Sequence, residues 1–172
     1  MPLRKSTALL AGAAALVLTA LALAGCGGGS DTDATPTTAN GNAATIGVAN
    51  GDLGKILVDS QGRTLYLFQK DSGSTSTCFG ECAVDWPPLR VGGRPTEGNG
   101  ANSALVGTTN RAGGEPQVTY NGHPLYRFER DENAGDTNGE GVNAFGGAWY
   151  ALTPAGDEVT PPANGGGGGY GY

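Results

Sequence analysis

Cys78 and Cys82 are the pair of side chains whose type and spacing most readily support chemistry. Two thiols this close can form a structural disulfide, cycle between dithiol and disulfide, or bind a soft metal ion. The spacing is C-x3-C, without the βαβ pattern of thioredoxin-like enzymes, and a soft metal would find only Met1 and His123 as further ligands. We expect a structural disulfide that pins a local turn, with a reducible, redox-active ring as the alternative.

The segment RDENAGDTNGEGVNAFGG, residues 130–147, gathers carboxylates among turn residues. Its oxygen ligands could bind Ca²⁺. The candidate ligands are Asp131, Asp136, Asn138 and Glu140. The segment lacks the Glu at the twelfth position and the flanking helices of an EF-hand, so a solvated acidic loop between strands is the other interpretation.

His123 is the sole histidine and follows Asn121-Gly122, a turn at which we expect it to be exposed to solvent. The sequence contains no Gly-x-Ser-x-Gly, zinc or phosphate-loop motif. We therefore expect no enzymatic activity and no cofactor other than the Ca²⁺ of the acidic loop.

A repeated motif, Tyr-x-Phe-x-x-Asp, occurs in TLYLFQKD (residues 64–71) and PLYRFERD (residues 124–131), 60 positions apart. Its residues are Tyr66, Phe68 and Asp71 in the first copy and Tyr126, Phe128 and Asp131 in the second. The motif could be a site that occurs twice or a structural unit that the chain uses twice. Each Asp stands where a predicted strand ends and a Gly-containing loop begins, which favours a turn or Asx cap.

The segments around the motif predict strands. Both copies read as strand, tight turn, strand, and Asn121-Gly122 is typical of a type I′ hairpin. Segments 45–49 and 104–109 precede the hairpins, and Trp-containing segments 85–89 and 148–152 follow them. We expect an all-β domain at residues 45–160, made of two four-stranded antiparallel meanders (about 45–98 and 99–160) packed as a small sandwich or partly closed barrel.

Alternation along the motif strands assigns side chains to two faces. The tyrosines and phenylalanines share one face, and the other carries Leu65, Leu67, Leu125 and Arg127. Because Arg127 indicates a partly wet surface, we expect the aromatic face to form the core, with an aromatic ligand platform as the alternative.

The N-terminal residues predict export. Residues 1–25 combine a basic start with an uncharged apolar run, as in a secretory signal peptide. The ending Leu23-Ala24-Gly25-Cys26 resembles the lipobox of bacterial lipoproteins, in which Cys26 would carry diacylglycerol on its sulfur. Residues 26–44 and the Gly-rich residues 161–172 are poor in large apolar residues, so we expect a flexible lipidated tether and a disordered tail.

The acidic balance limits the partners. Lys and Arg number 10 against 16 Asp and Glu, and removal of Arg4 and Lys5 with the signal takes the formal net charge from −6 to −8. A surface of that sign disfavours nucleic acid.

Taken together, the motifs resemble the secreted-repeat bacterial lipoproteins of unknown function, described by a Tyr-x-(Phe/Trp/Tyr)-x-x-Asp motif. The resemblance rests on both motif copies, the block Cys78…Cys82…Trp86-Pro87-Pro88-Leu89, the loop 135–139 and the strand 146–150. It implies an exported tandem-repeat lipoprotein and brings no established activity. We expect a non-enzymatic binding module that is lipid-anchored on the extracytoplasmic face of the cell membrane, with an envelope protein or a small ligand as partner. The alternative is an envelope redox or metal-handling protein that uses Cys78 and Cys82 or the acidic loop 131–140.

Overall fold

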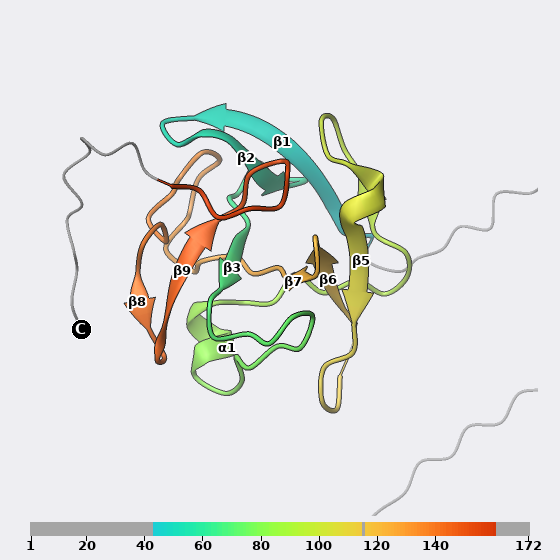
Figure 1. Cartoon of the computed structure of the whole chain (residues 1–172), viewed down its shortest axis with the longest axis vertical. Helices are drawn as coiled ribbons and strands as arrows, with labels where there is room; N and C mark the ends of the chain where they lie inside the picture. The colour runs from blue at the N-terminus through green and yellow to red at the C-terminus, as the bar shows by residue number, and fades with distance from the viewer. Residues whose placement is uncertain (1–42, 115, 161–172) are drawn as a thin grey trace, which may run out of the picture. The chain divides into compact units, whose positions relative to one another are not determined.

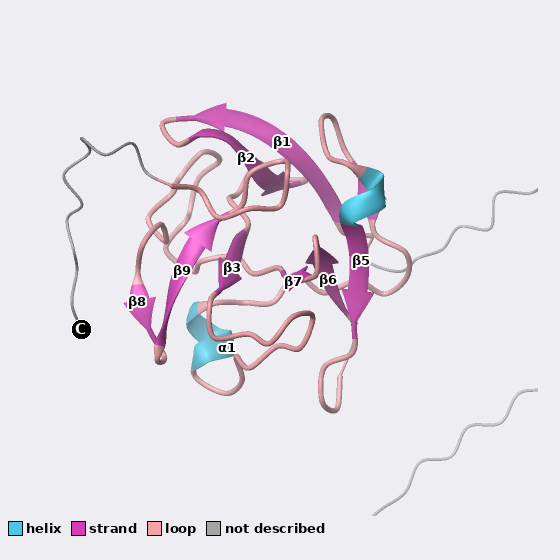
Figure 2. Ribbon diagram, viewed as in Figure 1, coloured by secondary structure: helices cyan, strands magenta, loops and turns pink. Residues whose placement is uncertain are grey.

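The computed structural model describes residues 43–114 and 116–160 (Figure 1). The predicted signal peptide, Cys26, most of the tether and the tail lie outside these residues. The strands are β1 (Thr45–Gly51), β2 (Gly54–Asp59), β3 (Tyr66–Phe68), β4 (Thr96–Glu97), β5 (Val106–Thr109), β6 (Gln117–Tyr120), β7 (His123–Pro124), β8 (Asn143–Ala144) and β9 (Gly147–Ala151). The helical turns are α1 (Cys82–Asp85) and the 3-10 turn η1 (Ser103–Leu105). Figure 2 shows that these short strands are joined by long loops.

The strands form three sheets of three strands each, with the orders β2-β1-β4, β3-β9-β8 and β5-β6-β7. All pairs are antiparallel except β1 with β4, which is parallel. The all-β prediction is therefore confirmed, and none of the three sheets closes into a barrel.

The strands do not form the two separate four-stranded meanders that the sequence predicts. β3 of the first repeat pairs with β9 of the second, with Leu67 opposite Tyr150. Tyr66 and Tyr126 also form an antiparallel bridge, because each backbone N–H donates to the other's carbonyl at 2.9 and 3.0 Å. The two motif tyrosines are thus direct partners across the repeats, and the halves are interlocked.

The first repeat also lacks its predicted fourth strand. Residues 82–85 form α1, and beyond it Pro88 makes only an isolated bridge to Tyr126. Since neither Pro87 nor Pro88 has a backbone N–H, this segment cannot donate to a regular ladder at those positions.

The turn between β6 and β7 has the predicted form. Asn121 and Gly122 have φ values of 49° and 81°, as a type I′ turn requires at both central positions. His123 lies in β7 opposite Tyr120 and is partly buried, so it is less exposed than the sequence indicated.

Two buried clusters lie on the two faces of the motif strands. The aromatic cluster contains Ile56, Val58, Tyr66, Phe68, Cys78, Cys82, Trp86, Tyr126, Phe128, Trp149, Ala151 and Val159. The aliphatic cluster contains Ala44, Ile46, Leu57, Leu65, Leu67, Leu89, Val91, Val118, Tyr120, Leu125 and Leu152.

The second face, predicted to be partly wet, is exposed at Arg127 alone and is otherwise a second core. Leu65, Leu67 and Leu125 expose 0%, 2% and 0% of their surface, and among the four residues on that face only Arg127 keeps a partly exposed side chain. The strands between the clusters are buried on both sides. Within the described ranges, no helix has the length and apolar character needed to cross a membrane.

The interlocked sheets lead to a prediction about the isolated halves. Residues 43–98 and 99–160, produced as separate chains, should each remain unfolded, because β3 and β9 would each lose a hydrogen-bonded neighbour and both cores would be split. Circular dichroism and the dispersion of amide proton shifts in NMR spectra show whether each half is folded. A dispersed spectrum from either half alone would show that the repeats fold independently.

Candidate functional site

The motif tyrosines and aspartates pair between repeats. Tyr66 Oη donates a hydrogen bond to Asp131 Oδ2 at 2.6 Å, and Tyr126 Oη donates one to Asp71 Oδ2 at 2.6 Å. Each Tyr therefore bonds the Asp of the other copy, although the spacing of the motif is defined within one copy. The two hydrogen bonds form a reciprocal pair, which we call the crossed Tyr–Asp bonds.

Each aspartate also holds the loop that follows it. Asp71 Oδ1 accepts hydrogen bonds from the backbone N–H and the hydroxyl of Thr77, at 2.7 and 3.0 Å. Asp131 Oδ1 accepts one from the backbone N–H of Asn138 at 2.9 Å. Each of the two carboxylates thus orders the loop that follows it with one oxygen and binds the Tyr of the opposite repeat with the other.

The protonation of these groups follows from their environment. Burial raises the pKa of Asp71 and Asp131, although the hydrogen bonds from the tyrosines and the loops oppose the shift. Burial also raises the pKa of Tyr66 and Tyr126 well above the ordinary tyrosine value, and the adjacent carboxylate adds to the effect in each. Both phenols therefore keep their protons at neutral pH and act as donors, which suits a structural role better than proton abstraction.

Four stacked rings connect the repeats beside the crossed Tyr–Asp bonds. The stack runs Phe68, Trp149, Trp86, Phe128, with centroid separations of 4.0, 3.9 and 4.2 Å. Each Phe stacks on the Trp of the other repeat, and each Tyr contacts the Trp of its own repeat edge-on at 5.4 and 5.2 Å. The two edge-on contacts have the T-shaped geometry that aromatic pairs favour. The aromatic face is core, as the sequence predicts.

The loop after Asp131 is packed tightly against this core. A Cβ on Gly139 would lie 2.8 Å from Tyr66 Cζ and 2.9 Å from Trp86 Cη2. The Gly139 N–H also donates to the Tyr66 hydroxyl at 3.3 Å. A glycine is needed here because two buried rings leave no room for a side chain.

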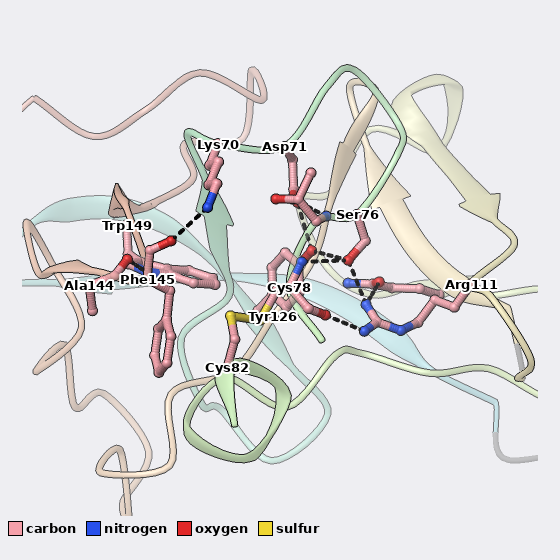
Figure 3. The surroundings of a disulfide bond; sticks show 12 residues. Lys70, Asp71, Ser76, Cys78, Cys82, Arg111, Tyr126, Ala144, Phe145 and Trp149 are labelled. Carbon is pink, nitrogen blue, oxygen red and sulfur yellow. Dashed lines mark hydrogen bonds between the residues drawn. A yellow bond between two sulfur atoms is a disulfide. The ribbon is translucent and has the colours of Figure 1, made fainter. Parts of the chain in front are cut away.

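The predicted disulfide between Cys78 and Cys82 is confirmed. Both residues are buried, with 0% and 5% exposed surface. In Figure 3, Arg111 and Ser76 lie to one side of the disulfide and Phe145 and Trp149 to the other.

The buried Arg111 ties the disulfide loop to the second repeat. Its guanidinium donates to Ser76 Oγ and Gln117 Oε1, both at 2.7 Å, and to the carbonyl oxygen of Cys78. Ser76 Oγ is also hydrogen-bonded to the Tyr126 hydroxyl at 2.7 Å. The disulfide therefore fixes a loop that supports one of the crossed Tyr–Asp bonds.

The four acidic-loop residues predicted as Ca²⁺ ligands bind different protein groups. Asp136 Oδ2 accepts from the backbone N–H of Asn133 at 2.8 Å, and Asn138 Nδ2 donates to the Arg130 carbonyl at 3.2 Å. Within residues 43–114 and 116–160, no three His, Cys, Asp or Glu side chains are grouped as a metal site. This arrangement does not support Ca²⁺ binding, which stays a prediction.

Glu140, the last of these residues, faces the β9 backbone. Its Oε2 accepts from the Ala151 N–H at 2.8 Å, whereas its buried Oε1 has no hydrogen-bond partner among the residues that the structure describes. Burial raises the pKa of Glu140, and the nearby Glu158 adds to the shift.

A buried ion pair at the β2 turn was not predicted from the sequence. Asp59 Oδ2 accepts hydrogen bonds from Arg63 Nη2 and Arg127 Nε, both at 2.8 Å, while Oδ1 accepts from the Gln61 N–H at 2.8 Å. Burial alone would raise the pKa of Asp59, but the hydrogen bonds and Arg127 outweigh it and lower the pKa. Burial and the neighbouring Arg63 lower the pKa of Arg127.

When the two repeats are aligned, the residues of this ion pair occur in one copy only. The counterparts of Asp59 and Arg127, 60 positions away, are Thr119 and Leu67. In the sequence, Arg127 is the only one of these residues that attracts attention, and it indicates a solvent-exposed face rather than an ion pair. The pair lines a cavity of about 760 Å³ together with Pro87 and Pro88.

A second cavity, of about 460 Å³, lies at one end of the aromatic stack. We call it the stack-end cavity; it is lined by Asp85, Trp86, Phe128, Arg130, Val142, Asn143, Ala144, Phe145 and Gly146. The sequence singled out none of its rim residues Asp85, Asn143 and Phe145, because they belong to no motif and come from both repeats.

The turn at the rim of the stack-end cavity is strained. Phe145 and Gly146 have φ values of 56° and 86°, so a bulky side chain occupies the left-handed region. Lys70 Nζ donates to the Phe145 carbonyl at 3.0 Å, and Trp149 Nε1 donates to the Ala144 carbonyl at 3.3 Å, which hold the turn (Figure 3). Phe145 is 38% exposed.

Comparison with known families matches two stretches, residues 47–90 and 107–153, to one family described as a secreted repeat of unknown function. Each stretch contains one copy of Tyr-x-Phe-x-x-Asp. No curated protein and no solved structure matches the chain.

The crossed Tyr–Asp bonds predict a specific energetic coupling. Tyr66→Phe and Asp131→Asn should each lower the free energy of unfolding by about 2 kcal/mol, since each leaves a buried group short of a partner. A double-mutant cycle should give a coupling of about 1–2 kcal/mol between them. The control cycle pairs Tyr66→Phe with Asp71→Asn in the same motif copy and should couple by less than about 0.5 kcal/mol. Equal couplings in the two cycles, measured by urea denaturation, would rule out the crossed pairing.

The Asp59 ion pair predicts a pH-dependent stability. Asp59→Asn should cost about 2 kcal/mol at neutral pH, less than a fully buried pair, because the arginine side chains are 29% and 30% exposed. The folded pKa of Asp59 lies below 3.8, so its contribution is complete above about pH 4 and is lost as the pH falls through the folded pKa.

Urea denaturation measures the free energy of unfolding. The difference in this free energy between wild type and Asp59→Asn should shrink when the pH is lowered from about 7 to about 3. The matched control is Asp52→Asn, which removes the same charge from the exposed β1–β2 turn. If the stability difference between wild type and Asp59→Asn grows towards acid pH, the pKa of Asp59 is not lowered in the folded protein.

Proposed function

Since the chain belongs to the family of secreted repeats of unknown function, which matches more than half of its length, we propose that it is a lipid-anchored binding module of the cell envelope. In this proposal the folded domain stands on the extracytoplasmic face of the cell membrane and binds an envelope protein or a small ligand. It catalyses no reaction.

The binding role is supported by the observation that the motif residues bind each other. Tyr66, Tyr126, Asp71 and Asp131 are the repeated groups with the chemistry of an active site, and all four are engaged in the crossed Tyr–Asp bonds. The two tryptophans expose 1% and 0% of their surface. The motif therefore supports the framework, and recognition falls to the surfaces in which the repeats differ.

The cysteine pairing supports the lipid anchor. The chain has three cysteines, and Cys78 and Cys82 are bonded to each other. Cys26, at the end of the lipobox-like segment, is thus not required by the disulfide of the domain. A diacylglycerol group and a further acyl chain on one residue would give stable membrane attachment, because two chains anchor where one is reversible.

A redox or metal-handling role has less support from the disulfide and the acidic loop. Both sulfurs of the disulfide belong to buried residues, and Asp131, Asp136 and Glu140 each accept a hydrogen bond from a backbone N–H of the domain. The acidic balance of the chain also supports a partner other than nucleic acid.

Mass spectrometry of the N-terminal peptide from the mature protein tests the anchor. We expect the mature chain to begin at Cys26 and to carry a diacylglyceryl group, and cells supplied with labelled palmitate should label the chain. Cys26→Ser should abolish the label, whereas the matched Cys78→Ala/Cys82→Ala variant, which keeps Cys26, should retain it. An unmodified Cys26 in the mature chain, or a mature N-terminus beyond it, would refute the anchor.

A further inference from the structure

The two ends of the aromatic stack differ. At the Phe68 end the backbone lies so close that a Cβ on Gly147 would be 2.9 Å from Phe68 Cε2. At the other end, Phe128 and its stacking partner Trp86 line the stack-end cavity, and the Arg130 guanidinium carbon lies 5.9 Å from the centre of the Phe128 ring. The stack is thus closed by backbone at one end and adjoins a cavity at the other.

The size and walls of the stack-end cavity suit a small molecule. Its volume of about 460 Å³ lies within the range of roughly 300–1,000 Å³ that ligand pockets occupy. Trp86, Phe128, Val142 and Phe145 supply apolar or aromatic wall, and Asp85, Arg130 and Asn143 supply a few polar groups. A planar ring in this space would continue the packing of the four rings already stacked.

Phe145 occupies a position that favours a different residue. The β6–β7 turn has the same backbone form and uses Asn121-Gly122, the residues that this turn prefers. A bulky residue at positive φ is held in an unfavourable backbone conformation. The chain therefore keeps an exposed aromatic ring on the cavity rim at the expense of backbone strain, and Lys70 and Trp149 hold it there.

The charges around the cavity favour an uncharged ligand. Asp85 and Arg130 contribute one charge of each sign to the lining, and the Arg130 guanidinium also lies 3.6 Å from Glu129 Oε1. The amide of Asn143 can both donate and accept a hydrogen bond. An anion would meet no excess of positive charge on a chain whose formal net charge is −6, and a cation would meet the guanidinium.

We propose that the stack-end cavity binds a planar, uncharged heteroaromatic molecule that carries both a hydrogen-bond donor and an acceptor on its edge. The ring packs between Phe128, the last ring of the stack, and Phe145, and the polar edge faces Asp85, Arg130 and Asn143. This inference rests on the proposed binding role and names its ligand class; it does not depend on the lipid at Cys26.

Isothermal titration calorimetry with quinolin-2-one tests the proposal on the mature full chain in lipid nanodiscs, with empty nanodiscs as the blank. Quinolin-2-one is planar and uncharged and has adjacent donor and acceptor groups. Its saturated counterpart, decahydroquinolin-2-one, keeps the polar edge and loses the planar ring, and 2-naphthoate keeps a planar ring and adds a negative charge. We expect saturable binding of quinolin-2-one and at least about fivefold weaker binding of the other two.

The decisive variant is Phe145→Asn, which gives this turn the Asn-Gly sequence of the β6–β7 turn. It should weaken quinolin-2-one binding about three- to tenfold while raising the thermal midpoint, because the ring is lost and the backbone strain is relieved. A loss of affinity through unfolding would lower the midpoint instead. The control is Phe79→Ser, which removes a ring that is also exposed (Phe79 is 48% exposed and Phe145 38%) but does not line the cavity, and it should leave the affinity unchanged.

The ligand class is overturned if quinolin-2-one shows no binding at millimolar concentration, if the saturated or anionic probe binds as tightly, or if Phe145→Asn binds as well as wild type. These outcomes are separate from the test of the anchor. A lipidated chain that binds no probe overturns the cavity proposal alone, and a chain that binds the probe without lipid on Cys26 overturns the anchor alone.

Discussion

The crossed Tyr–Asp bonds place a strong constraint on the whole domain. Each joins a buried phenol to a carboxylate that is buried at Asp131 and half-buried at Asp71, and an unpaired carboxylate in that environment would be costly. The same aspartates order the loops at residues 71–77 and 131–138, so the loops and the opposite strands must be in place together. The aromatic stack then fits between the halves, since each Phe stacks on the Trp of the other repeat. Local turns, strand pairing and core packing in this fold thus depend on one set of contacts.

Much of the fold could be predicted because its signals are local. The Asn121-Gly122 turn, the period-two placement of Tyr66 and Phe68, and the short spacing of Cys78 and Cys82 each specify nearby structure. The crossed pairing could not be predicted in this way, because a motif spacing gives no information on whether its Tyr and Asp meet within a copy or between copies. The burial of Leu65 and Leu125 was missed for a related reason: Arg127 indicated a wet face, and its buried partner Asp59 comes from another strand. The stack-end cavity has no sequence signal, since residues from three separate segments line it.

The repeats share a framework and differ in what they add to it. The first inserts the disulfide and α1 before its Trp, whereas the second inserts the acidic loop and the β8–β9 hairpin. The stack-end cavity lies where these two insertions meet, with Asp85 from the first and Phe145 from the second. The symmetric contacts therefore form the shared framework of the domain, and the asymmetric segments add a surface that neither copy could form alone.

The reciprocal pairing of Tyr66 and Tyr126 has the geometry of an isologous interface, in which residue i contacts residue j and j contacts i. In a dimer of single repeats, such an interface would form only at a sufficient concentration of chains. Here the two partners are segments of one polypeptide, so their association is intramolecular and proceeds at an effective concentration of the order of millimolar. Assembly of the aromatic core is consequently independent of how many copies of the protein a cell makes, and dilution does not dissociate it.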